Sequence, residues 1–175
     1  SEVDKVVEDV KRMLKEVEDR NEKVIRDVEK MLREVEEKNK RVIEDSERVA
    51  KEAADDRDRE KVRRLLERIR ELHERTIKET RDVARELAKL LEDTIRFTRK
   101  VLRELEELLR DVLRRVPNVK EKLDKVLEEI REIVKRLEDR NREALRRIKE
   151  IVDRLEKRNR KVVEDVERIV REIER

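Results

Sequence analysis

The chain has 175 residues, of which 58% are charged and 35% hydrophobic, and its formal net charge is +3. It contains no Cys and no Gly, so disulfides and thiolate metal sites are excluded and glycine-rich phosphate loops are not expected. The predominance of Glu, Lys, Arg, Leu, Val and Ile is typical of a coiled coil or a long helical bundle.

Residues 2–54 carry an apolar pattern that repeats every 18 residues. The first repeat consists of Val6, Val7, Val10, Met13, Leu14 and Val17, which recur as Val24, Ile25, Val28, Met31, Leu32 and Val35. These positions cover about 120° of a helix surface, which suits one helix of a bundle. Eighteen residues make about five turns, and such a repeat lacks the drift that makes seven- and eleven-residue repeats supercoil. We therefore expect a nearly straight helix.

The stretch DDRDREK, residues 55–61, contains no apolar residue and separates the first helix from a second one, predicted over 58–115. Across this stretch the apolar stripe changes phase by about 150°, so one continuous helix would direct its two halves to opposite sides. We predict a turn near 54–58, with one of the aspartates as the N-cap of the second helix.

A second break is predicted at Pro117, because proline cannot occupy a helix interior. Asn118 and Glu121 fit the N-cap of the next helix and its partner three residues later. The third helix is predicted over residues 119–175, and its apolar pattern matches that of the first helix shifted by 120 residues.

Short connections make neighbouring helices antiparallel. The predicted fold is therefore all-α: a long, antiparallel, up-down-up three-helix bundle, coiled-coil-like with nearly straight helices. We expect residues 1–175 to form this bundle as a single domain.

Asparagines occupy positions of the first and third helices where the repeat calls for an apolar residue. Asn141 and Asn159 follow Asn21 and Asn39 by 120 residues, which places each pair at one height. Folding about the two turns brings residues of the second helix to the same heights. The expected buried polar layers are Asn21, Thr94 and Asn141 with Thr98 as a further candidate, and Asn39, Thr76 and Asn159 with Thr80 and His73 as further candidates.

The internal repeat explains why polar residues belong in this core. A core that repeats every 18 residues loses little apolar contact when one helix slides by about 27 Å. A misplaced Asn, however, is buried without partners, which costs about 1–3 kcal/mol. A single polar core position can specify register in coiled coils. We predict that the polar layers specify helix register and pairing.

His73 occupies the apolar stripe of the second helix. The segment HERTI, residues 73–77, lacks the second His of a zinc-protease motif, and Arg70 stands where a di-iron Glu-x-x-His motif needs Glu. We interpret His73 as a core or network histidine, whose burial makes stability fall on acidification. No metal and no cofactor is predicted.

Phe97 lies about 90° from the centre of the same stripe. In one interpretation it is a boundary residue that covers the interface between two helices. In the other it anchors a partner helix or a second bundle, since exposed aromatic residues mark interfaces. The sequence leaves both open.

The charged residues do not indicate catalysis or nucleic-acid binding. Paired carboxylates such as Glu36 and Glu37 lie among Lys and Arg on solvent faces, whereas acid–base catalysis needs carboxylates beside a substrate pocket, so no enzymatic activity is predicted. Basic residues alternate with acidic ones and one Phe provides no stacking platform, so no nucleic-acid partner is expected.

No apolar run approaches the roughly 20 residues of a membrane span, and the apolar stripes lack interfacial aromatics. No membrane partner is expected. No stretch resembles a signal or transit segment, so we expect a soluble protein whose compartment the sequence does not indicate.

The 18-residue repeat, the Asn at one phase of it, the absent Gly and the surfaces rich in Glu, Lys and Arg resemble de novo designed, parametrically generated helical bundles with buried hydrogen-bond networks. The resemblance covers the whole chain. It implies an idealised, very stable structural scaffold without a natural ligand or required partner, and we expect a monomer. The alternative is an interaction module that self-associates or accepts a partner helix, with the asparagines facing that partner.

Overall fold

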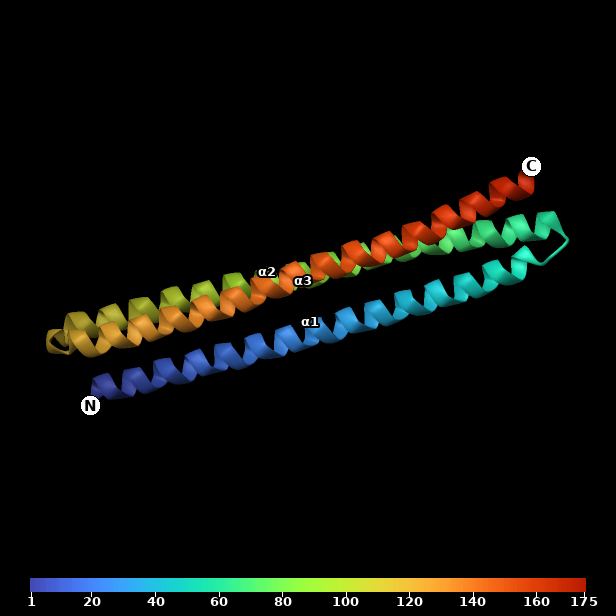
Figure 1. Cartoon of the computed structure of the whole chain (residues 1–175). Coiled ribbons are helices and arrows are strands. Elements are labelled where there is room, and N and C mark those ends of the chain that lie inside the picture. The colour runs from blue at the N-terminus through green and yellow to red at the C-terminus, as the bar shows by residue number, and fades with distance from the viewer. The chain divides into compact units, whose positions relative to one another are not determined.

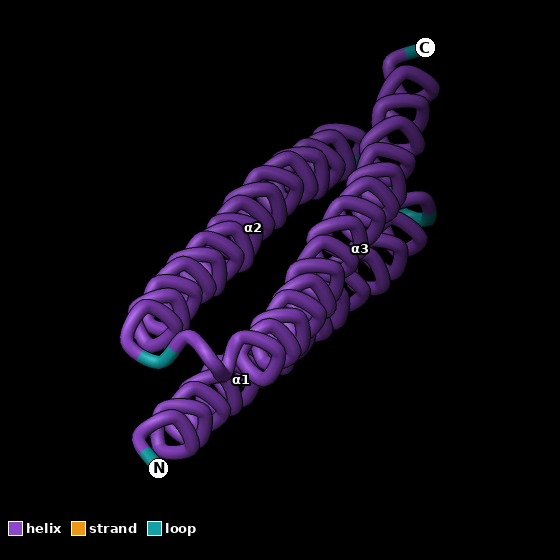
Figure 2. The backbone as a smooth tube through the Cα atoms, turned by 90° about the vertical axis from the view of Figure 1, so that its left-hand side faces the viewer, coloured by secondary structure: helices purple, strands orange, loops and turns teal.

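A computed structural model describes residues 1–175 and contains three long α-helices, one short 3-10 helix and no strand. The α-helices are α1 (Glu2–Ala54), α2 (Arg59–Arg115) and α3 (Lys120–Glu174), and the 3-10 helix is η1 (Pro117–Val119). Figure 1 shows them in chain order, and the short connections appear in teal in Figure 2. The chain therefore folds as an all-α three-helix bundle. None of its helices has an apolar stretch long enough to span a bilayer.

Side-chain caps define where the first two helices begin. The Ser1 hydroxyl accepts a hydrogen bond from the Asp4 backbone N–H at 3.3 Å, and the Asp58 carboxylate accepts one from the Lys61 N–H at 3.2 Å. Each cap satisfies one of the N–H groups that the first helical turn leaves without a partner. Asp58 is thus the aspartate that caps the second helix.

The turn between α1 and α2 is made without glycine, and no residue of the chain has a positive φ. The last carbonyls of α1 are instead satisfied by 3-10-type bonds, from Asp55 N–H to Glu52 O and from Asp56 N–H to Ala53 O. Such bonds tighten a final turn and leave the left-handed region unused.

The start of the third helix differs from the prediction that Asn118 would be its N-cap. Asn118 lies inside η1, and residue Val116, which precedes η1, makes no capping side-chain hydrogen bond. Pro117 occupies the first position of η1, where its fixed φ and missing N–H are tolerated. The short 3-10 turn therefore leads directly into α3.

The chain divides into two compact units, each containing parts of all three α-helices. Unit 1 comprises Ser1–Val28 and Ala88–Arg146, and unit 2 comprises Glu29–Leu87 and Arg147–Arg175. Unit 1 holds the N-terminus and the α2–α3 connection, whereas unit 2 holds the α1–α2 connection and the C-terminus (Figure 1).

In unit 1 the helix directions follow from contacts between side chains. The Arg115 guanidinium lies 3.0 Å from the Glu2 carboxylate, and the Arg20 guanidinium stacks on the Phe97 ring, so α1 and α2 are antiparallel. Asn141 of α3 bonds Asn21 of α1. In unit 2 Lys38 contacts Glu79 and Ser46 contacts His73, so α1 and α2 are antiparallel there as well.

Aliphatic side chains fill the interior of each unit. In unit 1 the core includes Val10, Leu105 and Ile130, one from each helix, and none is more than 1% exposed. In unit 2 a cluster around Leu66 packs beside the α1–α2 turn. Burying one such side chain contributes about 1.5–3 kcal/mol, so these apolar stripes supply the main stabilisation of the bundle.

Candidate functional site

A chain of five buried polar side chains crosses the core of unit 2. We call it the unit 2 network. Asn159 Nδ2 donates to Asn39 Oδ1 at 2.7 Å, and Asn39 Nδ2 donates to Thr80 Oγ1 at 3.1 Å. On the other side His73 Nδ1 lies 2.7 Å from Asn159 Oδ1, and His73 Nε2 lies 2.7 Å from Ser46 Oγ. All five side chains are at most 4% exposed.

The asparagines of this network use all their hydrogen-bonding groups. Each also donates to the carbonyl four residues earlier in its own helix, Asn39 to Val35 and Asn159 to Leu155. No buried side-chain nitrogen or oxygen in the network is left without a partner. A network completed in this way avoids the penalty of buried unpaired groups, and it links all three helices at one height.

His73 is held as the neutral tautomer protonated on Nδ1. The Asn159 amide donates through Nδ2 elsewhere, so its oxygen must accept from His73 Nδ1–H, and Nε2 then accepts from the Ser46 hydroxyl. Burial lowers the pKa of His73 below its usual 6.5, and the hydrogen bond to Asn159 opposes that shift. A neutral imidazole with both nitrogens engaged is a structural group here rather than a free base.

Unit 1 contains a smaller version of the same arrangement. Asn141 Nδ2 donates to Asn21 Oδ1 at 2.6 Å and to the Leu137 carbonyl at 2.8 Å. Asn21 Nδ2 and Asn141 Oδ1 are buried and have no protein partner. The 18-residue repeat explains the unpaired Asn141 Oδ1, because Leu91 and Val28 stand at the positions of His73 and Ser46.

Three of the threonines expected in the polar layers bond their own helix instead. Thr76 donates to Leu72 O, Thr94 to Leu90 O and Thr98 to Thr94 O, at 2.8–2.9 Å. A helical Thr satisfies itself in this way without any neighbour. Thr76 and Thr98 are buried and Thr94 is partly exposed, but none of them bonds an asparagine. Thr80 and His73 are the residues of α2 that do.

Ser46 is the network residue that was not predicted from the sequence. It stands on the apolar stripe of α1, at the position of Val28 one repeat earlier, and it is 2% exposed. That polar substitution in an otherwise apolar phase is the same signal that identified the asparagines.

Phe97 packs against α1 within unit 1. The Arg20 guanidinium lies 4.5 Å from the centroid of its ring, a cation–π geometry, and the Phe97 side chain is 37% exposed. One repeat away, in unit 2, Lys38 and Glu79 form an ion pair at 3.1 Å in the same place. Phe97 therefore covers the boundary between α1 and α2 but still presents part of its ring to solvent.

Ion pairs flank both polar sites on the side of α2 and α3. Arg81 and Glu156 pair in unit 2, with Nη2 and Oε2 3.1 Å apart, and the equivalent Arg99 and Glu138 pair in unit 1 at 2.6 Å. The hydrogen bond from Arg81 holds the pKa of Glu156 below its ordinary value. Both carboxylates are already paired with a guanidinium, which does not suit them to proton transfer.

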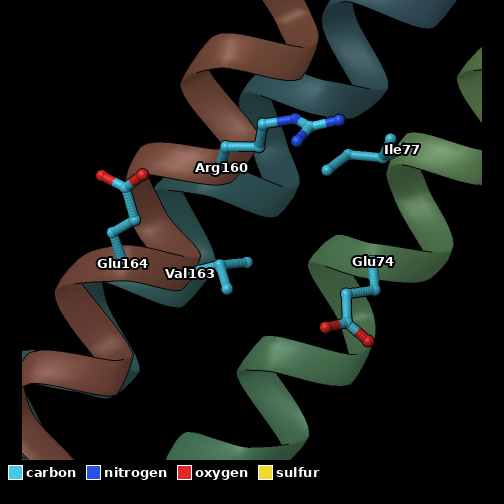
Figure 3. Close-up of a pocket in the computed structure, with 5 residues that line it drawn as sticks. All are labelled: Glu74, Ile77, Arg160, Val163 and Glu164. Carbon is cyan, nitrogen blue, oxygen red and sulfur yellow. The ribbon is translucent and has the colours of Figure 1, made fainter.

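A groove at the surface of unit 2 is lined by charged and aliphatic side chains. The groove in Figure 3, of about 360 Å³, lies between α2 and α3, where Ile77 and Val163 reach into the space and Glu74, Arg160 and Glu164 carry the charges. No Ser, Thr, Cys or His side chain lines it. Residues 1–175 contain no group of three His, Cys, Asp or Glu side chains placed to hold a metal ion.

Comparison with known proteins gives a structural likeness without a family. No protein-family model matches the chain, and no curated protein matches its sequence. Among solved structures it is similar to a "Computationally designed three helix bundle", with a TM-score of 0.56 and 19% identity over 98% of this chain and 88% of that one. At this identity the likeness shows a shared three-helix-bundle fold and nothing finer.

Proposed function

We propose that this chain is a designed structural scaffold in which buried side-chain hydrogen bonds specify how the helices pair. The unit 2 network carries the proposal, because it joins α1, α2 and α3 through side chains that are at most 4% exposed. The likeness to a computationally designed bundle and the 18-residue repeat support the same conclusion.

The energetic argument concerns wrong arrangements more than the correct one. A buried hydrogen bond adds only about 1 kcal/mol to stability, because the same groups bond water in the unfolded chain. If α3 slides by a turn, Asn39 Oδ1 and His73 Nδ1 lose Asn159, and each unpaired group costs about 1–3 kcal/mol. Aliphatic side chains alone impose a weaker penalty, since shifted stripes still overlap.

An interaction module is the second candidate, and one observation favours it. Met13, Leu90 and Phe97 of unit 1 are 37–40% exposed, and Leu90 and Phe97 line one hollow between α1 and α2. Large apolar side chains grouped at the surface mark contact sites for partners. In that reading a second copy or a partner helix covers the hollow.

The mass in solution separates the two candidates. Light scattering after size-exclusion chromatography should give a single species of about 21.5 kDa across a wide range of concentrations if the chain is a self-sufficient scaffold. A species of twice or three times that mass supports the module and contradicts the scaffold. Phe97→Glu is the matched control for association through this hollow. It replaces the exposed ring by Glu, the residue that occupies the equivalent position 79 one repeat earlier.

A further inference from the structure

The contact between Ser46 and His73 places a hydroxyl against the one nitrogen of the ring that can take up a proton. Ser46 Oγ of α1 lies 2.7 Å from His73 Nε2 of α2, and both side chains are at most 2% exposed. In the neutral ring Nδ1 already carries a proton, which it donates to Asn159 Oδ1. The Ser46 hydroxyl therefore donates to Nε2. Any further proton on the ring must go to Nε2, the atom that faces Ser46.

A serine hydroxyl can serve the charged ring as well as the neutral one. It has one donor and two acceptor lone pairs, and its hydrogen rotates to suit its neighbours. When Nε2 is protonated, Ser46 Oγ can accept from it, and the hydroxyl hydrogen then needs another acceptor. Helical hydroxyls of this chain find one four residues earlier, as Thr76 does at Leu72 O. For Ser46 the corresponding acceptor is the carbonyl of Val42.

We propose that the Ser46–His73 contact is a proton-responsive hydrogen bond, which reverses its direction on acidification and keeps the histidine in the core. The Nε2 lone pair forms an N–H bond with a proton from solvent, the ring becomes an imidazolium, and Ser46 changes from donor to acceptor. On the other side of the ring, Nδ1–H continues to donate to Asn159 Oδ1. Asn159 also keeps its bond to Asn39, so α1 and α3 stay joined at this height. The response does not depend on whether the network specifies helix pairing.

The groups that face the ring are polar but uncharged. Ser46 faces it from α1 and Asn159 from α3, and neither side chain titrates. Burial lowers the pKa of His73 and the hydrogen bond to Asn159 raises it, with no contribution from a charged group. An imidazolium in this place is therefore stabilised by its two hydrogen bonds and not by a carboxylate. Charged residues of the neighbouring turns pair with one another at the surface: Asp45 with Arg48, and Arg70 with Glu74 and Glu167.

The internal repeat shows which substitution removes the hydroxyl without disturbing the core. Val28 stands at the position equivalent to Ser46 and is 0% exposed, so valine fits this phase of the α1 stripe. Threonine has nearly the volume of valine but keeps a hydroxyl. Ser46→Thr and Ser46→Val therefore form a matched pair in which only one variant can accept a hydrogen bond from the charged ring.

Nitrogen magnetic resonance of the imidazole tests the proposal on the full chain. His73 is the only histidine, so its ring signals need no further assignment. As the pH falls from about 8 to about 4, the parent and Ser46→Thr should change from the Nδ1–H tautomer to the imidazolium, with the helical circular dichroism retained and the Nδ1 proton still protected from exchange. Ser46→Val should bind the proton at least about tenfold more weakly, because a hydrogen bond to a charged group is roughly twice as strong as a neutral one. Its titration midpoint should lie lower by about one pH unit or more.

Three results would overturn the proposal. Equal midpoints in Ser46→Thr and Ser46→Val show that the hydroxyl takes no part in protonation. A parent ring that stays neutral until the helices unfold shows that the core does not accept the charge. Loss of the protected Nδ1 proton when the parent ring is protonated shows that the imidazolium has left Asn159.

Discussion

Replacing Asn159 by leucine should destabilise the protein, whereas the same replacement of Asn141, one repeat earlier in α3, should not. Both substitutions remove the donor to an asparagine of α1 and both bury an additional aliphatic side chain. These shared effects cancel when the two variants are compared. What differs is the second partner, because Asn159 also accepts from His73 and Asn141 Oδ1 accepts from no protein group.

The size of the difference follows from the cost of buried unpaired groups. Asn159→Leu leaves His73 Nδ1 without an acceptor at 0% exposure, which costs about 1–3 kcal/mol. Asn141→Leu removes an oxygen that is already buried and unpaired, which returns about 1–3 kcal/mol. The free energy of unfolding of Asn159→Leu should therefore be lower than that of Asn141→Leu by about 2–6 kcal/mol.

Guanidinium unfolding followed by circular dichroism measures this difference, provided that the two variants unfold with the same dependence on denaturant. Thr76→Val is a suitable control, because the Thr76 hydroxyl bonds only the Leu72 carbonyl of its own helix. Its loss should lower the free energy of unfolding by less than the loss of Asn159 does. Equal stabilities of Asn159→Leu and Asn141→Leu, or a lower stability of Asn141→Leu, would refute the reasoning.

The remaining predictions concern His73, the missing partners of unit 1 and Phe97. Because burial lowers the pKa of His73, the unfolded chain binds its proton first, so the free energy of unfolding should fall below pH 6.5 by up to about 1.4 kcal/mol per pH unit. His73→Leu should abolish this slope above about pH 5, where carboxylates such as Glu156 with lowered pKa are still ionised, and an unchanged slope contradicts the prediction. Val28→Ser combined with Leu91→His should create a second histidine whose pKa, followed by proton resonance, lies below 6.5; a normal pKa shows that the new imidazole stays solvated. Phe97→Glu should cost less than about 1 kcal/mol in denaturant unfolding, because the ring is 37% exposed and an exposed cation–π contact is weak; a loss of several kcal/mol means that Phe97 belongs to the core.

The helices and the turns between them could be predicted from the sequence because they depend on local chemistry. The lack of Gly, the apolar stretch of each helix and the single proline are visible without knowledge of any contact. The prediction that Asn118 is the N-cap of α3 was wrong, since Asn118 lies in a 3-10 turn that begins at Pro117. A difference of one turn between a 3-10 and an α-helical start is small in energy and leaves little trace in the sequence.

The sequence predicted at which heights the polar side chains lie, but not which of them form hydrogen bonds with one another. The offset of 120 residues predicts that asparagines of α1 and α3 meet, and the structure pairs Asn21 with Asn141 and Asn39 with Asn159. Which threonine joins them depends on side-chain rotamers, because a helical Thr chooses between a carbonyl of its own helix and a neighbour. Thr80 is the one that accepts from an asparagine. The role of these layers in specifying register stays a prediction.

Distance measurements by electron paramagnetic resonance test that role most directly. The chain has no Cys, so Lys40→Cys and Arg158→Cys place two spin labels at exposed positions of α1 and α3 beside the unit 2 network. The comparison variant carries Leu at all four buried asparagines, Asn21, Asn39, Asn141 and Asn159. We predict one narrow distance in the parent and additional populations, displaced by about 5 Å or more, in the comparison variant. The same narrow distance in both proteins would contradict the claim that buried polar groups specify the register of the helices.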